Sequence, residues 1–181
     1  MTTSQTSNHI VVMRRGQFYY FDVLDSSSRP ILTEPEILRN LRAIVSDADQ
    51  TPPSAVSTSA VGVLTTENRK HWARLRRILQ HHSSKRNSEC LDVIDHALFM
   101  VCLDDATPEG TAEMCKNFLC GTYRLEGGVQ TGTCTNRWYD KLQIIVCQNG
   151  VAGINFEHTG VDGESSVSLT FLDVSHLLFL V

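Results

Sequence analysis

The chain has 181 residues, of which 41% are hydrophobic and 20% are charged, and its net charge is −4. This composition argues against a disordered chain, and the length allows one hydrophobic core or a part of a larger enzyme. The small negative charge excludes a general electrostatic attraction of the whole chain to nucleic acid or to an anionic membrane.

The amino-terminal region predicts a β-hairpin. Residues 1–9 are polar and are expected to form a disordered segment. Strands are predicted at Ile10–Met13 and Gln17–Val23 because apolar and β-branched or aromatic residues flank an Arg-Arg-Gly turn.

A helix is predicted next, because Thr33 and Glu36 have the spacing of a capping box and Pro35 suits a first helical turn. Its buried face would carry apolar residues at helical spacing. The following segment, Gln50–Ser59, is rich in Thr, Pro and Ser and is predicted to be a loop. The apolar residues of the predicted helix are Ile37, Leu38, Leu41, Ile44 and Val45.

The middle of the chain predicts a short strand at Val61–Leu64 and then three helices. Thr65 or Thr66 is expected to cap the first helix, Ser88 the second, and Gly121 to close the third. The predicted inner faces comprise Asn68, Trp72, Leu75 and Leu79 in the first helix, Leu91, Ile94, Leu98 and Val101 in the second, and Ala112, Cys115, Phe118 and Leu119 in the third.

The carboxyl-terminal third predicts a glycine-rich loop and a second hairpin. The loop is Glu126–Gly132. Leu142–Cys147 and Val151–Phe156 are expected to pair across Asn149-Gly150, which is a strong hairpin signal. The pattern weakens after Gly163, so residues 164–181 are interpreted as a divergent tail.

The cysteines indicate an intracellular protein with reduced thiols. None of the six forms a C-x-x-C pair, and the sequence has no glycosylation sequon and no apolar signal-peptide core. The apolar run Leu177–Val181 is far too short to span a bilayer. Cys134 and Cys147 are possible nucleophiles, but nothing in the sequence supports a catalytic pairing of either cysteine with a histidine.

Metal binding and nucleic-acid binding are both disfavoured. The seven histidines show no H-E-x-x-H spacing, and the pair His81-His82 is interpreted as the solvated end of a helix. The basic run from Arg69 to Arg86 could bind phosphates, but a solvated helix face explains it more simply. We therefore expect neither a metal site nor a nucleic-acid partner.

His158 is the candidate for chemistry. It follows the predicted strand, in a glycine-bordered turn, with Asp162 four residues later. Histidine can take and return a proton near neutral pH, and a neighbouring carboxylate can hold one tautomer. The prediction is that His158 is a catalytic base and Asp162 orients it. The pattern alone also fits a surface or packing histidine.

The segment 137–163 resembles the choline/carnitine acyltransferase family. The resemblance comprises Arg137-Trp138-Tyr139-Asp140-Lys141, an apolar strand, Asn149-Gly150, Glu157-His158 and Asp162-Gly163 at fixed spacings. Two other stretches, GVLTTENR at 62–69 and ALFMVCLDD at 97–105, are similar to the family as well. The run RRGQFYYFDVLD at 14–25 is similar to fungal carnitine acetyltransferases.

The resemblance implies a fold and a reaction. The fold would be α/β (α+β), a chloramphenicol acetyltransferase-like mixed sheet flanked by helices, present here as a partial domain. His158 would remove a proton from the hydroxyl of carnitine, or from the thiol of coenzyme A in the reverse direction, with Asp162 in support. Coenzyme A or acetyl-CoA would be a co-substrate, with no tightly bound cofactor.

Family members are much longer than this chain, so it is interpreted as a fragment. Residues 10–163 would be part of the catalytic amino-terminal domain, and the isolated chain would be inactive without a second domain. An acetyl-preferring carnitine enzyme is favoured. A choline-specific or longer-acyl member, and a non-catalytic module that binds coenzyme A or carnitine, are the alternatives. The family implies a mitochondrial, peroxisomal or cytoplasmic location, and the sequence does not choose among them or give an oligomeric state.

Overall fold

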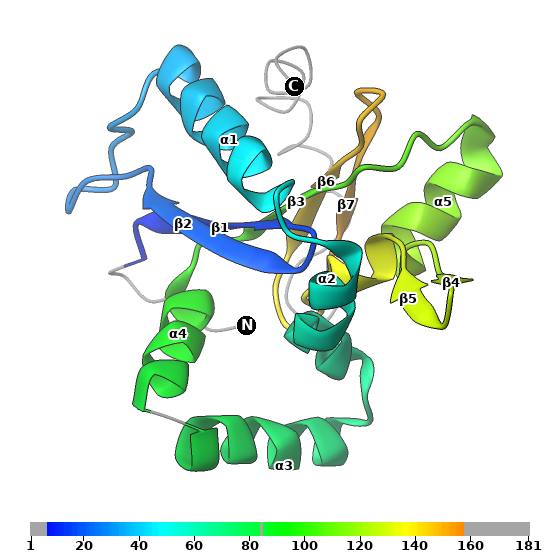
Figure 1. Ribbon diagram of the computed structural model, residues 1–181. Coiled ribbons are helices and arrows are strands. Elements are labelled where there is room, and N and C mark those ends of the chain that lie inside the picture. The colour runs from blue at the N-terminus through cyan, green and yellow to red at the C-terminus, as the bar shows by residue number, and fades with distance from the viewer. Residues whose placement is uncertain (1–6, 84, 158–181) are drawn as a thin grey trace.

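A mixed sheet with helices on both of its faces organises the protein. The computed structural model describes residues 7–83 and 85–157. Five strands lie in the order β2-β1-β3-β6-β7, and a two-stranded hairpin, β4-β5, stands apart from them (Figure 1). The predicted α/β class, with a mixed sheet flanked by helices, is confirmed.

The centre of the sheet is parallel and both edges are antiparallel. Val12, Val101 and Ile144 are aligned across the three central strands. Each edge strand pairs with its neighbour as a hairpin, so both predicted hairpins are confirmed. The strands are β1 (His9–Arg14), β2 (Gln17–Asp22), β3 (Met100–Leu103), β6 (Gln143–Val146) and β7 (Ala152–Asn155).

Helix α1 (Glu34–Ala48) covers one face of the sheet (Figure 1). The predicted capping box starts it: Glu36 accepts hydrogen bonds from the Thr33 backbone N–H at 2.8 Å and from the Thr33 hydroxyl at 2.7 Å. Leu41 and Ile44 are buried against this face of the sheet. The residues of this cluster that come from the strands are Ile10, Val12, Leu103, Ile144 and Val146.

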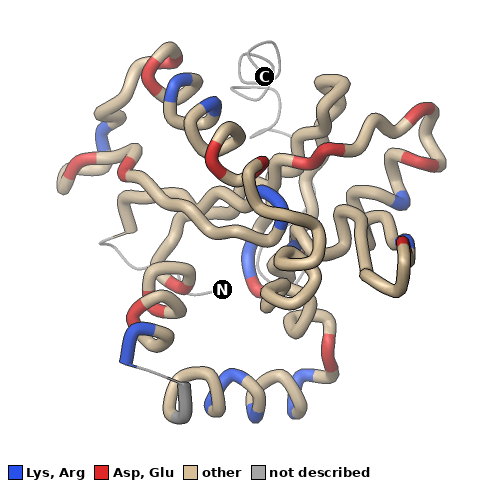
Figure 2. The backbone as a smooth tube through the Cα atoms, in the orientation of Figure 1, with Lys and Arg blue, Asp and Glu red and all other residues tan. Residues whose placement is uncertain are grey.

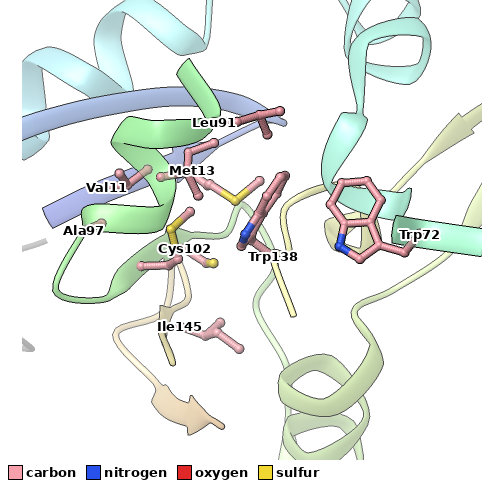
Figure 3. Close-up of a cluster of buried hydrophobic side chains, with 10 residues drawn as sticks. Val11, Met13, Trp72, Leu91, Ala97, Cys102, Trp138 and Ile145 are labelled. Atoms are coloured by element: carbon pink, nitrogen blue, oxygen red, sulfur yellow. The ribbon is translucent and has the colours of Figure 1, made fainter. Parts of the chain in front are cut away.

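The opposite face holds a cluster built around two tryptophans, with helices α3 (Arg69–Ile78) and α4 (Lys85–His96). The rings of Trp72 and Trp138 meet edge to face, with centroids 5.8 Å apart. Figure 3 shows Trp138 between Met13 and Cys102 on one side and Trp72 on the other. This cluster joins α3 to the sheet through Trp72, whose exposure is only 2%.

Two short helices replace a predicted loop and a predicted strand. The segment predicted to be a loop contains α2 (Pro53–Ser59), which begins at a proline because the first residue of a helix needs no amide hydrogen bond. On its inner side Val56 is buried and Ala55 is half-buried. The expected strand is a 3₁₀-helix, Val61–Thr66. Gly62 in it lies against the Arg137 carbonyl, and Thr65 donates to the Gly62 carbonyl at 2.6 Å. Packing of backbone on backbone therefore overrode the strand propensity.

The helix boundaries differ from the expected caps. Asn68 caps α3, because its side chain accepts from the Lys70 amide at 3.0 Å, so neither Thr65 nor Thr66 does. A π-helical turn, Leu79–Ser83, follows α3. Helix α4 begins at Lys85 and ends at His96, so Leu98 lies beyond the helix and Val101 lies in β3. Leu91 and Ile94 are buried as predicted.

Helix α5 (Gly110–Cys120) ends before Gly121 as predicted, with Gly121 at φ 75°. Its buried residue is Asn117. Of the predicted inner residues, Phe118 is half-buried and packs against the core, whereas Ala112, Cys115 and Leu119 are exposed. The apolar spacing failed here because a polar network selects the inner face of this helix.

The predicted glycine-rich loop contains a hairpin, β4 (Arg124–Glu126) and β5 (Val129–Thr131). Gly127 and Gly128 turn it with φ of 59° and 82°, as a two-residue turn of this kind requires. Thr122 and Thr133 close its base, since each hydroxyl accepts from the other residue's amide, at 2.8 and 3.0 Å.

The ends of the chain are described only in part. Of the segment expected to be disordered, residues 7–9 are described: Ser7 is buried and His9 is the first residue of β1. The tail 164–181 lies outside the described residues. No described helix has the length and apolar character needed to cross a bilayer.

Gly62→Ala tests the close approach of the 3₁₀-helix to the Arg137 backbone. An added Cβ would lie 2.2 Å from the Arg137 carbonyl oxygen, so the backbone must shift. We expect the free energy of unfolding, measured in urea, to fall by about 3 kcal/mol. Gly110→Ala is the control: Gly110 has φ +74° but nothing within 4 Å, so the loss should be only about 1 kcal/mol. Equal losses in the two variants would contradict the packing argument.

Candidate active site

The two predicted catalytic residues, His158 and Asp162, lie outside the described residues. The description ends at Glu157, which is exposed and immediately precedes His158 in the sequence. The described structure therefore bears on the elements that lead to His158, not on its ring.

The β6-β7 hairpin is the element that leads there. Gln143 pairs with Asn155 and Val146 pairs with Ala152. The turn has three residues, 148–150, because the Cys147 amide donates to the Val151 carbonyl at 2.9 Å. Gly150 takes φ 80° at the last position of the turn. The Asn-Gly pair thus forms the predicted hairpin with a loop one residue longer than the shortest type.

Helix α5 and the segment just before it fix this hairpin near both of its ends. The Asn155 side-chain amide donates to the Phe118 carbonyl at 2.8 Å, and the Asn149 side-chain amide donates to the Pro108 carbonyl at 3.0 Å. Between them, Gly153 leaves room for the Phe118 ring, which an added Cβ would meet at 2.5 Å. The position of the last residues before His158 is therefore set by the carboxyl end of α5.

The Arg137–Lys141 segment holds the scaffold together. Tyr139 donates to the Leu119 carbonyl at 2.8 Å, close to the anchor of Asn155. Asp140 accepts from the Trp72 indole at 2.6 Å and from Arg69 at 2.7 Å.

Lys141 completes the same scaffold at the other end of the segment. Its ammonium donates to the Asp95 carbonyl and to the Ala97 carbonyl, the latter at 2.7 Å, and so satisfies the carboxyl end of α4. Burial lowers the pKa of Lys141, and the Asp95 charge opposes this shift. The described contacts of the segment are thus structural.

Arg137 forms a fully buried ion pair with Asp104, in which both side chains have zero exposure. The pairing is bidentate: Nη1 donates to Oδ1 at 2.9 Å and Nη2 donates to Oδ2 at 2.8 Å. Arg137 also donates to the carbonyls of Asn136 at 2.8 Å and Asn117 at 2.7 Å. Burial alone would lower the pKa of Arg137, but the contact with Asp104 outweighs it and the net pKa is raised. The guanidinium therefore stays charged.

Two asparagines extend this pair into a network at the carboxyl ends of the parallel strands. Asn117 donates to Asp104 at 2.9 Å and to the Cys147 sulfur at 3.3 Å. Asn136 donates to Asp104 at 3.1 Å and to the carbonyls of Leu103 and Met13 at 3.2 and 3.3 Å. Helix α5 and the strands β1, β3 and β6 are thereby tied to one carboxylate.

The candidate nucleophilic cysteines are poorly suited to attack. Cys147 is buried, and burial, together with the Asp104 charge, raises its pKa to about 11. A thiol must be deprotonated to act as a nucleophile, so Cys147 is inert near neutral pH. Cys134 is half-buried and accepts from the Gln130 amide at 3.3 Å. All six cysteines are free.

A cleft of about 660 Å³ opens at the carboxyl edge of the parallel strands. Its walls come from α5, the β4-β5 hairpin and the segment after β3, and its lining includes Asp105, Lys116, Arg124 and Thr133. Strand β7 leads away from this edge, since Ala152 is level with Val146 and Asn155 with Gln143. We therefore assign no step of acyl transfer to this cleft.

Two arginines of the basic run from Arg69 to Arg86 form ion pairs within the described structure. Arg69 pairs with Asp140, and Arg76 pairs with Asp95 and lies over the Trp72 ring. Among the residues that the structure describes, no three His, Cys, Asp or Glu side chains gather in a way that could hold a metal ion.

Comparison with known proteins decides the family. A family model described as Choline/Carnitine o-acyltransferase matches residues 1–175. The chain belongs to this family. The resemblance carried by segment 137–163 is confirmed.

Individual members of the acyltransferase family match over most of this chain. It is 49% identical over 182 residues to the "Putative mitochondrial carnitine O-acetyltransferase" of Saccharomyces cerevisiae, covering 93% of this chain and 26% of that protein. It is 36% identical over 162 residues to human mitochondrial carnitine O-palmitoyltransferase 2, covering 89% and 22%. A second carnitine O-acetyltransferase of S. cerevisiae is 31% identical over 191 residues, covering 91% and 20%. The chain spans about a fifth to a quarter of the length of these relatives.

Sequence reasoning missed the ion pair at the centre of this acyltransferase-family chain. Arg137 and Asp104 both lay within stretches that carried the resemblance, but no role was assigned to either. A carboxylate directly after a buried strand, and an arginine in front of a tryptophan, were the available signals. Asn117 and Asn136 gave no signal, because a buried asparagine is recognised only once its partners are known.

Asp104→Asn tests the ion pair. The substitution leaves the Arg137 charge buried without its partner, so the free energy of unfolding should fall by about 3–5 kcal/mol. Asp105→Asn is the matched control, at the next residue in the sequence. The Asp105 side chain is exposed and its ion-pair contact with Arg15 is long, at 3.7 Å, so the free energy of unfolding should change by no more than about 0.5 kcal/mol. Urea unfolding followed by tryptophan fluorescence measures both. A loss below about 1 kcal/mol for Asp104→Asn would show that the pair is not a central constraint.

Proposed function

We propose that this chain supplies the histidine side of the active site of a carnitine acyltransferase, which transfers an acetyl group between coenzyme A and carnitine. His158 acts as the general base, taking the proton of the carnitine hydroxyl, or of the coenzyme A thiol in reverse. Asp162 supports the histidine. The relative that is 49% identical over 93% of the chain, and is named a carnitine O-acetyltransferase, carries this proposal.

The described scaffold supports the proposed role of His158. A general base must be held within hydrogen-bond reach of its proton, so the residues before it need a fixed position. Asn155 and Gly153 lock β7 onto α5, and Tyr139 bonds the same end of that helix. The chain is therefore anchored to α5 up to Asn155, the last residue of β7, two residues before Glu157.

The remainder of the cleft is proposed to come from outside these residues. The chain matches at most 26% of the length of the relatives described above, so we expect it to turn over little substrate alone. Oxyanion stabilisation is often the largest catalytic contribution, and the loss of one donor costs roughly 10²–10³ in rate. Relatives named as mitochondrial also lead us to infer that the protein works inside the cell.

A longer acyl group is the second candidate. Human carnitine O-palmitoyltransferase 2 is 36% identical, more than the 31% of the second yeast acetyltransferase. Two chimeras separate the candidates, with this chain replacing the matching segment of the 49%-identical yeast protein or of the human enzyme. The measured quantity is kcat/KM for acetyl-CoA divided by kcat/KM for palmitoyl-CoA, in each chimera and in its parent. A higher value in the chimeras supports the acetyl proposal, and a lower value supports the longer acyl group.

His158→Ala in the yeast chimera tests the base. Turnover of acetyl-CoA with carnitine, followed by release of free thiol, should fall by roughly 10²–10⁴, because general-base catalysis contributes about that much. KM should change little, because the proton transfer acts mainly in the transition state. His96→Ala is the matched control, since His96 is exposed at the end of α4 and should be silent. Near-normal turnover of the His158→Ala chimera would refute the assignment.

A further inference from the structure

We propose that the outer edge of the β4-β5 hairpin is an interface through which two copies of this chain form a symmetric dimer. The interface, here named the β4 edge, comprises residues 123–127. All three residues of β4 are exposed, and β5 lies against α2, which leaves β4 on the outer side of the hairpin. Figure 1 shows the hairpin at one margin of the molecule, and in Figure 2 a positive and a negative segment of the tube meet on it.

The register of the hairpin directs the backbone groups of Leu125 outward. Glu126 and Val129 flank the two-residue turn and therefore form a hydrogen-bonded pair. Hydrogen-bonded and non-hydrogen-bonded pairs alternate along an antiparallel ladder, so Leu125, which is level with Gln130, makes no ladder bond to β5. No other described segment supplies a backbone hydrogen bond to Leu125. Its N–H and C=O are thus available to another strand.

The charges of β4 select one register for a symmetric antiparallel pair. The two-fold axis could pass level with Arg124, Leu125 or Glu126. An axis at either charged residue places two like charges directly opposite each other, which is destabilising, whereas the axis at Leu125 places Arg124 of each copy opposite Glu126 of the other. Neither charged side chain forms a salt bridge within residues 7–83 and 85–157, so both can pair across the axis.

The same register brings apolar side chains together on the other face of the strand. Tyr123 and Leu125 are 60% and 62% exposed, and they point away from the face of Arg124 and Glu126 because side chains alternate along a strand. The two Leu125 side chains would meet across the axis, and Tyr123 would lie opposite Gly127 of the second copy. An aromatic side chain stabilises a glycine that lies across from it in a sheet. Apolar burial therefore adds to the backbone hydrogen bonds.

The assembly would close at two copies. Pairing of the two β4 edges gives a four-stranded antiparallel sheet in the order β5-β4-β4-β5, in which each outer strand lies against its own α2. Such an isologous contact uses both edges and leaves none for a third copy. Because five residues from each chain make a small interface, we expect weak association, with a dissociation constant of about 0.1 mM.

Sedimentation velocity of the 181-residue chain tests the proposal. Between about 5 μM and 500 μM the weight-average mass should rise from 20.2 kDa toward twice that value. Arg124→Glu and Glu126→Arg each create like charges at both cross-strand pairs, so each should weaken dimerisation at least about tenfold. Arg42→Glu is the matched control: it reverses an exposed charge on α1, away from the hairpin, and should leave dimerisation unchanged.

A mixture of the two variants separates the proposed pairing from damage to the hairpin. In an equimolar mixture of the Arg124→Glu and Glu126→Arg chains, a mixed dimer has opposite charges at both pairs again, so association should return to within about threefold of that of the unchanged chain. Circular dichroism checks that each variant is folded. An unchanged chain that stays monomeric at about 500 μM, single variants that associate as the unchanged chain does, a mixture that stays monomeric, or an equal loss in Arg42→Glu would each overturn the proposal.

Discussion

Three parallel strands end on one guanidinium-carboxylate contact that solvent does not reach. A buried ion pair costs much of its attraction in desolvation, so it persists only where further hydrogen bonds satisfy both partners. Here Asn117 and Asn136 supply those bonds to Asp104, and two backbone carbonyls accept from the terminal nitrogens of Arg137, whereas its buried Nε has no partner among the described residues. Strands β1 and β3, helix α5 and Cys147 directly after β6 all contribute groups to this network. The pair therefore connects the sheet to α5 through groups that are distant in the sequence.

The same network explains how the scaffold reaches the proposed site. The ion pair holds α5 through Asn117, and α5 holds the β7 strand through its Phe118 carbonyl and ring. The five residues from Arg137 onward belong to this chain of contacts, so the segment that carries the family resemblance is a structural signature. It identifies the fold and says little about the acyl group, because none of its described side chains is free to select a substrate.

Sequence patterns predicted the elements whose packing is simple. The first hairpin, α1 with its capping box, and the β6-β7 hairpin followed from alternation, caps and Asn-Gly. The pattern failed where distant contacts decide. Val61–Thr66 curls because Gly62 meets the Arg137 backbone, Val101 joins the sheet, and α5 turns Asn117 inward in place of Leu119. For the site, only the approach through β7 is described, and His158 and Asp162 stay predictions.

The mutual hydrogen bonds between Thr122 and Thr133 have a separate consequence. They close the base of the β4-β5 hairpin independently of what lies at its tip. At the tip, Gly127 and Gly128 have no neighbouring atoms that an added Cβ would meet within 4 Å. Strand β5 lies against α2 and is half-buried, so only the tip of the hairpin is free to vary in length and composition. Residues inserted at this tip would therefore not disturb the sheet.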